Sequence, residues 1–212
     1  PTTFRKRADR IIVRCGDYHL KNETDNQNVQ IKKVKKFKNH ESYGYLSAHY
    51  DIAILYFEND FKATKYVRPI CLQSPTKLER QEPAIVVGWG KDENGEAGNE
   101  LKETTLQILD SDTCENRVGK VKWITDGFGD DLFCAVDPKG WTVEVGGSGS
   151  GKGDSGGPIF SLKTSPSLRY ELKGLVNAGT RTIPDIYTRT GFPKIHKWIV
   201  DNVECSDGQH CV

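Results

Sequence analysis

Short strand-like runs separated by turn residues are the feature that most restricts the folds open to this chain. Runs rich in β-branched and aromatic residues recur along its length, and Gly, Pro, Asn and Asp lie between them. The runs are 11–13, 29–37, 52–57, 84–88, 105–109, 141–145, 159–162, 170–176 and 186–188. Such a pattern predicts an all-β fold, built as a barrel or a sandwich.

One segment departs from this pattern, residues 192–203, which read FPKIHKWIVDNV. Ile195, Trp198 and Ile199 are spaced i, i+3 and i+4, which places three apolar side chains on one face of a helix. We therefore expect one helix, at the end of the chain. No repeat and no linker divides the sequence, so we expect a single domain.

The charge of the chain excludes some partners. Its net charge is +1, which gives no overall field to attract nucleic acid. One basic run, Lys32 to Lys38, is interpreted as a solvated strand face, with a polyanion-binding patch as the less favoured alternative. No run of 18 apolar residues occurs, so no membrane-spanning segment is predicted. The absence of Met and the Pro at position 1 suggest a processed chain or a fragment.

The cysteines suit an oxidising compartment. Six occur, at positions 15, 71, 114, 134, 205 and 211, and no C-x-x-C pair is present. We therefore predict no zinc site, no other metal and no cofactor, and expect the disulfides of a secreted protein, although six cysteines allow 15 pairings. Asn22-Glu23-Thr24 is an acceptor sequence for N-glycosylation, which agrees with secretion.

The glycine-rich stretch VGGSGSGKGDSGGP (145–158) has two interpretations. Residues 146–152 match the G-x-x-x-x-G-K core of a phosphate-binding loop. Such a loop needs Ser or Thr after the lysine and a helix directly behind it, whereas Gly153 follows Lys152 and the next residues are poor helix formers. We therefore reject the nucleotide-binding interpretation.

The second interpretation is a serine nucleophile in the sequence G-D-S-G-G-P (153–158). The glycines after Ser155 allow a tight turn that leaves the hydroxyl accessible. Gly153 has no side chain, so its N–H and that of Ser155 can both face a developing oxyanion. Asp154 is a carboxylate in this turn, and we expect it to need a buried positive partner.

With this motif the chain resembles the chymotrypsin/trypsin-like serine endopeptidases. Further matches follow in the family's order along essentially the whole chain: HYDIAILYF (49–57), YVRPICL (66–72), VVGWG (86–90), LFCA (132–135), PDIYTRT (184–190) and the KWI of the last helix. The resemblance implies two six-stranded antiparallel β-barrels with the active site between them, followed by a C-terminal helix.

We divide the single protease domain on this basis. Residues 1–70 would be the remainder of a first barrel that lacks its N-terminal strands, and 71–191 the second barrel with the crossover. Residues 192–204 would form the helix and 205–212 a cysteine-containing tail.

The resemblance also implies roles for single residues. Ser155 matches the nucleophile and Asp51 the carboxylate that orients the catalytic histidine. The N–H groups of Gly153 and Ser155 match the oxyanion hole. Asp154 matches the acid that pairs with the amine freed by activation.

The family's histidine has no counterpart in residues 1–212. In the family it precedes the aspartate within an A-H-C-like motif, and no A-H-C occurs here. His49 lies two residues before Asp51, so strand alternation would place both on one face, but the family puts the histidine on another segment. His19, His40, His196 and His210 are expected at the surface or in packing. We therefore expect the histidine on a segment outside this sequence.

The specificity pocket departs from the usual pattern of the family. Gly149 stands where trypsin-like members carry an aspartate, while Asp185 stands where most have glycine. Asn177 and Gly179 belong to the pocket wall, which lacks the family's usual tryptophan. Asp185 predicts cleavage after Arg or Lys; the alternative is that it is solvated or paired with Arg181 or Arg189.

The resemblance also bears on the cysteines. It implies a bond between Cys114 and Cys134. Cys71 commonly bonds an upstream region in this family, Cys15 has either Cys71 or the missing segment as partner, and Cys205 and Cys211 are close enough in sequence to pair.

The resulting expectation is a secreted serine endopeptidase of a zymogen cascade that acts on protein substrates. Its partner would be the segment or chain that carries the histidine, linked through Cys71 or Cys15, with no nucleic acid and no membrane involved. The alternative is a catalytically impaired homologue that serves as a protein-binding or regulatory module.

Overall fold

A computed structural model describes residues 8–21, 28–44, 48–75, 78, 80–92, 94–118, 127–139, 147–165, 167–180 and 183–203. The described residues are mainly β-strands, with two α-helices and one short 3₁₀-helix. The elements are η1 (Ala8–Arg10), β1 (Ile12–Cys15), β2 (Gln30–Lys33), β3 (Lys36–Asn39), β4 (Ala53–Tyr56), β5 (Cys71–Leu72), β6 (Pro83–Gly88), β7 (Lys102–Ile108), α1 (Ser111–Val118), β8 (Leu132–Val136), β9 (Pro158–Lys163), β10 (Arg169–Thr180), β11 (Ile183–Arg189) and α2 (Pro193–Asn202).

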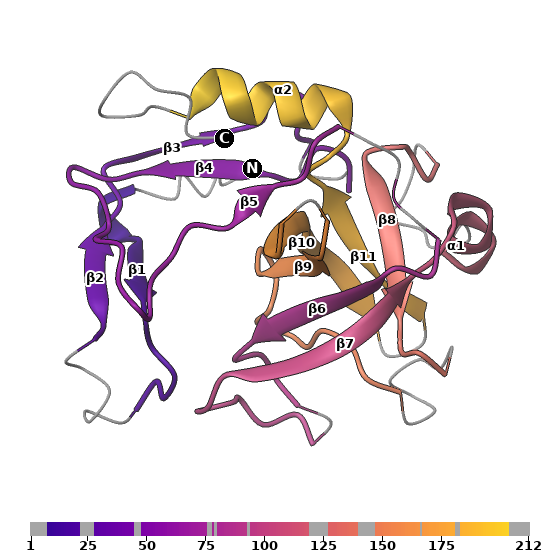
Figure 1. Ribbon diagram of the computed structural model, residues 1–212, viewed down its shortest axis with the longest axis horizontal. Coiled ribbons are helices and arrows are strands. Elements are labelled where there is room, and N and C mark those ends of the chain that lie inside the picture. Colours follow the sequence, from indigo (N-terminus) through magenta and orange to yellow (C-terminus); the bar gives the residue numbers. More distant parts are fainter. Residues whose placement is uncertain are drawn as a thin grey trace, which may run out of the picture.

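A closed β-barrel forms the larger part of the molecule (Figure 1). Its strands follow the order β6, β7, β8, β11, β10 and β9, every neighbouring pair is antiparallel, and β9 pairs with β6 to close the ring. Alternate side chains of these strands point inward and form one core: Ala84, Val86, Leu106, Ile108, Phe133, Ala135, Ile159, Val176 and Tyr187. The predicted all-β barrel fold is thereby confirmed.

The N-terminal part forms two separate ribbons, β1–β2 and β3–β4. In Figure 1, β1–β2 lies to the left of the barrel and β3–β4 lies at the upper left, below α2, and the described residues do not close the two ribbons into a second barrel. The single strand predicted over 29–37 is wrong, because the chain changes partners in its middle. Val34 N–H donates to the Ile11 carbonyl at 2.9 Å, whereas Lys35 N–H donates to Tyr56 at 2.8 Å. The domain boundaries proposed from the sequence stay predictions.

The predicted C-terminal helix is confirmed as α2. Pro193 stands at its start, where a missing N–H costs nothing, and Ile195 and Trp198 are buried against Ile52. At its far end Asn202 binds β3 and β4, because Lys38 Nζ donates to its side chain and Tyr56 Oη to its carbonyl, both at 2.7 Å. Neither α-helix of the described ranges is long and apolar enough to cross a bilayer.

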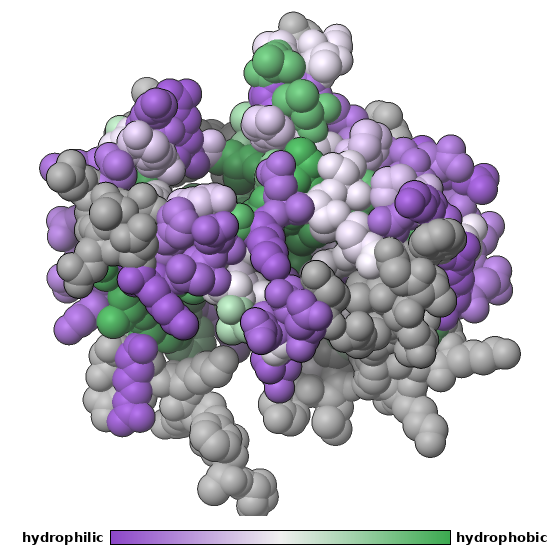
Figure 2. Space-filling view, turned by 90° about the horizontal axis from the view of Figure 1, so that it is seen from below, coloured by the Kyte–Doolittle hydropathy of each residue, from purple (hydrophilic) through white to green (hydrophobic). Residues whose placement is uncertain are grey.

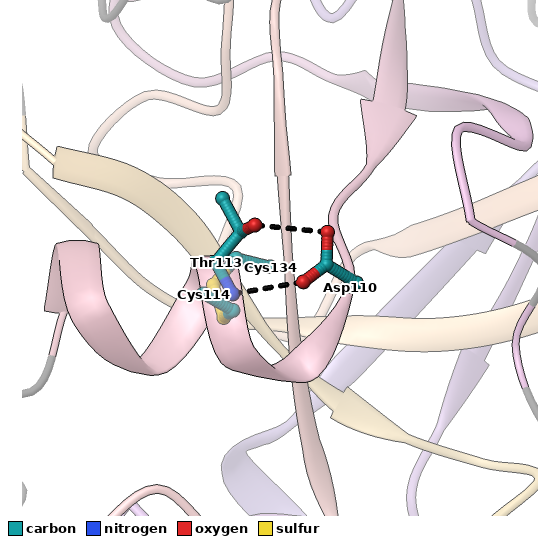
Figure 3. Close-up of a disulfide and its surroundings, with 4 residues drawn as sticks. All are labelled: Asp110, Thr113, Cys114 and Cys134. Atoms are coloured by element: carbon teal, nitrogen blue, oxygen red, sulfur yellow. Dashed lines mark hydrogen bonds between the residues drawn. A yellow bond between two sulfur atoms is a disulfide. The ribbon is translucent and has the colours of Figure 1, made fainter.

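Helix α1 was not predicted, because its sequence SDTCENRV carries no apolar stripe. Local capping and a disulfide stabilise it instead (Figure 3). The Asp110 carboxylate accepts hydrogen bonds from the Thr113 N–H and hydroxyl, both at 2.9 Å, which satisfies a free donor of the first turn. Cys114 bonds to Cys134 of β8. The Asp110–Thr113 spacing is the signal that could have revealed this helix.

Figure 2 shows the molecule from below, with hydrophilic residues over much of the coloured surface and hydrophobic ones near the middle of the face and on the projection at the top.

A buried ionic network lies at the junction of β9, β10 and the start of β6. The Lys173 ammonium, 1% exposed, lies 3.0 Å from Glu82 Oε1 and 3.5 Å from Glu171 Oε2, and Lys163 Nζ lies 3.0 Å from Glu82 Oε1. Burial by itself raises the pKa of Glu82, but the two lysines outweigh it and lower that pKa overall.

We expect Glu82→Gln to lower the free energy of unfolding by about 3 kcal/mol at pH 7, because it leaves the buried Lys173 without its nearest anion. Since the pKa of Glu82 is lowered in the folded state, this contribution is present above the unfolded pKa and is lost as the pH falls through the folded pKa. Urea denaturation at pH 7 and pH 3 measures both effects, with the exposed Glu115→Gln as control. An equal loss for both variants at pH 7 would contradict the prediction.

Candidate active site

Ser155 lies on a glycine-rich turn between the loop 147–153 and β9. Gly153 and Gly156 have φ angles of +114° and +82°, which favour glycine, so the sequence provides the two residues that this turn requires. Gly156 N–H donates to the Val176 carbonyl of β10 at 2.8 Å and fixes the turn to the barrel. The turn leaves Ser155 exposed. Strand β9, and no helix, follows it, which agrees with the rejection of a phosphate-binding loop, since such a loop needs a helix directly behind it.

Two backbone N–H groups of this turn have no acceptor in the described structure. The Gly153 and Ser155 amides make no hydrogen bond, whereas the neighbouring Asp154 and Gly157 amides donate to Gly151 and Asp154 carbonyls at 3.0 and 2.8 Å. A pair of unsatisfied donors beside an exposed hydroxyl is the arrangement that a developing oxyanion requires.

The side chain of Asp154 turns back toward the end of β6. Its Oδ1 accepts from Gly90 N–H at 2.7 Å and its Oδ2 from Gly151 N–H at 2.8 Å. Gly88 and Gly90 make room for the carboxylate, because a Cβ at either position would collide with it. In this structure backbone amides therefore satisfy Asp154, and the positive partner expected from the sequence is not among its described contacts.

A cavity of about 890 Å³ opens beside the turn that carries Ser155. It brings together most of the residues predicted for the oxyanion hole and pocket, since Gly149, Asp154, Ser155, Asn177 and Gly179 all line it. Gly153 does not line it, although both of its neighbours do. Asp185 does not line it either.

Asp185 lies behind the cavity wall, 4% exposed. Its Oδ2 accepts from the Ser150 N–H and, at 3.4 Å, from the Tyr187 hydroxyl, while a Cβ on Gly179 would meet its Oδ1. Burial raises the pKa of Asp185 to about 6, against the opposing hydrogen bonds from Ser150 and Tyr187. Of the two arginines considered as partners, Arg181 lies outside the described residues and Arg189 donates to the Asp130 carbonyl at 3.3 Å.

Asp51 occupies a turn before β4, and its carboxylate has no hydrogen-bond partner in the described structure. Although the residue is exposed, desolvation by the surrounding protein raises the pKa of its carboxyl. Its backbone is tightly held, because the Thr188 hydroxyl donates to the Asp51 carbonyl at 3.0 Å. Asn177 Nδ2 donates to Thr188 Oγ1 at 2.9 Å and to the Ala48 carbonyl at 2.7 Å. Asn177 therefore connects the Asp51 turn to the cavity that Ser155 lines.

Three of the described histidines contact side chains other than Ser155 and Asp51. His19 Nε2 lies 3.1 Å from Glu100 Oε1, His40 stacks on Tyr50 with ring centroids 4.6 Å apart, and His196 lies on α2. His49 binds Asp131, Nδ1 to Oδ1, at 2.8 Å.

The expected strand alternation of His49 and Asp51 is wrong. The intervening Tyr50 has a φ of +52°, so the segment is a turn rather than a strand. His210 lies outside the described residues.

The structure decides the pairing of four of the six cysteines. Cys114 and Cys134 are bonded, whereas Cys15 and Cys71 are both free thiols in this structure, so they are not bonded to each other. Cys205, Cys211 and the acceptor Asn22 lie outside the described residues. In the described ranges no group of three or more His, Cys, Asp or Glu side chains is arranged to hold a metal ion.

The arrangement can carry out part of an acyl transfer. It offers an exposed hydroxyl, two free N–H donors and an unpaired carboxylate on an anchored turn, but the described residues supply no histidine paired with Asp51 as a base for the hydroxyl. Sequence reasoning did not identify Thr188 or Asp131. Thr188 stands in the PDIYTRT motif, which was the only signal for it, and no local pattern pointed to Asp131.

Comparison with known proteins places this site in context. A family model described as Trypsin matches residues 4–199. Three relatives are each 30% identical to this chain: the serine proteinase stubble of Drosophila melanogaster, over 91% of this chain and 24% of that protein; the phenoloxidase-activating factor 3 of Holotrichia diomphalia, over 93% and 54%; and a venom protease of Bombus pensylvanicus, over 84% and 70%. The chain thus spans about a quarter of the first and about half of the second.

Proposed function

This chain belongs to the trypsin family of serine proteases, and on that premise we propose that it is the nucleophile-bearing part of a secreted endopeptidase. The observation that carries the proposal is the turn at Ser155, where an exposed hydroxyl stands beside the unpaired N–H groups of Gly153 and Ser155, at the edge of the cavity.

The proposed reaction is acyl transfer from a peptide bond to Ser155. The Ser155 oxygen attacks the peptide carbonyl while its proton passes to a histidine, and the oxyanion accepts hydrogen bonds from the two free amides. The histidine then protonates the leaving amine, and water releases the acyl group by the same route. Asp51 orients the histidine, and the unpaired state of its carboxylate fits a position that awaits this partner.

The proposal places the histidine outside residues 1–212, on a segment or chain bound to this one. The free thiols of Cys71, which is exposed, and of Cys15, which is half-buried, are the proposed points of covalent attachment. One relative is named a phenoloxidase-activating factor and another a clotting factor, and these names support the proposed place in a protease cascade. The proposed secretion is supported by the Cys114–Cys134 disulfide.

For specificity we propose that Asp185 favours Arg or Lys before the cut bond from its place behind the cavity wall, where Ser150 and Gly179 lie between its carboxylate and the cavity. Asp185→Asn is expected to lower kcat/KM for such substrates by roughly 10²–10³-fold, because a substrate cation loses its buried anion. In the unchanged protein, preference for basic over neutral residues should rise with pH through about 6, where Asp185 ionises. Pairs of peptide substrates that differ only in the residue before the cut bond measure this preference as a ratio of kcat/KM values. An unchanged preference would show that Asp185 does not reach the substrate.

The same variant should be more stable at pH 8. The pKa of Asp185 is raised on folding, so the stability that its neutral form provides is fully present below the unfolded pKa and is lost as the pH rises through about 6. At pH 8 the folded protein therefore holds a buried charge that lowers its free energy of unfolding. Asn keeps the acceptor for Ser150 without a charge. A gain of about 3 kcal/mol at pH 8, absent at pH 4, is therefore expected in urea denaturation.

A second candidate function is that of a protease-shaped binding module. The observation that favours it is that no base is paired with Asp51 in the described residues: His19, His40 and His49 contact other groups, and the Asp51 carboxylate is unpaired. A fluorophosphonate probe distinguishes the two functions when it is applied to the native secreted protein and the labelled residue is mapped by mass spectrometry. Label on Ser155 supports the protease, and folded, processed protein without label supports the binding module.

A further inference from the structure

The turn that carries Asp51 is strained and tight. Tyr50 has a φ of +52°, an unfavourable angle for a bulky side chain, and Ile52 N–H donates to the Tyr50 carbonyl at 2.8 Å. This bond closes a three-residue turn with Asp51 at its centre. A non-glycine residue in this conformation costs on the order of 1 kcal/mol or more, so contacts from outside the turn must hold it.

Much of that outside support comes from Asp131, at the start of β8. Its carboxylate is 5% exposed and binds two consecutive residues of the turn. Oδ2 accepts from Tyr50 N–H at 2.8 Å, and Oδ1 lies 2.8 Å from His49 Nδ1. The other ring nitrogen of His49 lies 3.1 Å from the Gly127 carbonyl. One buried carboxylate thus fixes the backbone and the side chain directly before Asp51.

The surroundings of this pair leave it little freedom. A Cβ on Gly129 would lie 2.7 Å from Asp131 Oδ1 and 2.9 Å from His49 Cε1, so the chain passes there without a side chain. The backbone of Asp131 is anchored to β11, because Arg189 N–H donates to its carbonyl at 2.8 Å. Asp131 and His49 therefore fix the position of the Asp51 turn relative to the barrel.

We propose that Asp131 and His49 are positioning residues for the reaction: they hold the strained turn so that the Asp51 carboxylate faces the incoming histidine. This inference rests on the proposed protease function. It gives His49 a role other than that of base, and it adds to the hydrogen bonds that Thr188 and Asn177 donate to the carbonyls of Asp51 and Ala48.

The test compares variants of the native, processed protein. Asp131→Ala is expected to lower kcat by roughly 10- to 100-fold with KM changed less than about threefold, because the reacting groups are misplaced while substrate contacts remain. Asp131→Asn should recover much of that loss, since its amide oxygen still accepts from Tyr50 N–H and its N–H₂ still lies within hydrogen-bond distance of His49 Nδ1. Asp130→Asn is the matched control, an exposed neighbouring acid whose carboxylate makes no described hydrogen bond.

Two further readouts keep the outcomes separate. Hydrogen exchange at the Tyr50 amide should accelerate in Asp131→Ala, and this measurement needs no activity. If Asp131→Ala does not fold, Gly129→Ala and His49→Gln, which leave the Asp131 charge in place, should still lower kcat. An active parent with unchanged kcat in these variants overturns the positioning role. A parent protein that never labels with fluorophosphonate refutes the protease function. If, in addition, the Tyr50 amide exchanges at the same rate in the parent and in Asp131→Ala, the structural hold by Asp131 is overturned as well.

Discussion

Ser155→Ala is expected to reduce peptide hydrolysis by roughly 10⁶-fold and to abolish fluorophosphonate labelling, in a protein that retains its fold. The size of the loss follows from the role proposed for the hydroxyl, because no other group of the turn can form the covalent intermediate. The fold should survive, because Ser155 is exposed and its side chain makes no described hydrogen bond. Steady-state kinetics on a peptide substrate and thermal unfolding measure the two properties.

A matched control is Ser165→Ala, which removes another exposed hydroxyl, on the turn between β9 and β10. It should leave both hydrolysis and labelling unchanged. Residual activity of about a thousandth of the parent or more in Ser155→Ala would place the nucleophile elsewhere. Loss of the label without loss of hydrolysis would have the same meaning.

Asp51→Asn is expected to lower kcat by roughly 10⁴-fold with little effect on stability. An amide cannot stabilise the positive charge that develops on the histidine, and it favours the wrong orientation of the ring. The turn itself should remain, because its described hydrogen bonds involve the backbone of Asp51 and not its carboxylate. Kinetics at saturating substrate, with thermal unfolding alongside, measure the effect.

The exposed Asp60→Asn, just beyond β4, controls for the loss of a surface carboxylate and should retain full activity. A variant that keeps more than a tenth of the parent kcat would show that Asp51 does not orient the base. The same result would remove the basis of the positioning role proposed for Asp131.

Local patterns predicted much of the fold. Strands β6, β9 and β10 were predicted because β-rich runs lie between turn residues, and α2 because its apolar residues follow the helical period. The same reasoning missed α1, whose stability comes from one cap and one disulfide. It also joined β2 to β3, because the change of partners at Val34 and Lys35 depends on residues 11 and 56.

In the candidate site, too, the features set by neighbouring residues were predictable and those set by tertiary packing were not. The turn at Ser155 was predictable because its chemistry is local: glycines with positive φ, an exposed hydroxyl and adjacent N–H groups all belong to six consecutive residues. The place of Asp185 was only partly predictable. Its position in the sequence suggested a pocket acid, but burial behind Ser150 and Gly179, which raises its pKa to about 6, depends on packing.

By itself, the sequence determined the glycine-rich turn at Ser155, the barrel strands with local signals and the final helix, because each depends on neighbours within a few residues. Only the tertiary structure decided what holds Asp51. Asp131, Thr188 and Asn177 reach its turn from 80, 137 and 126 positions away along the chain. Hydrogen bonds over such separations exist only after the barrel closes, and no sequence pattern records them.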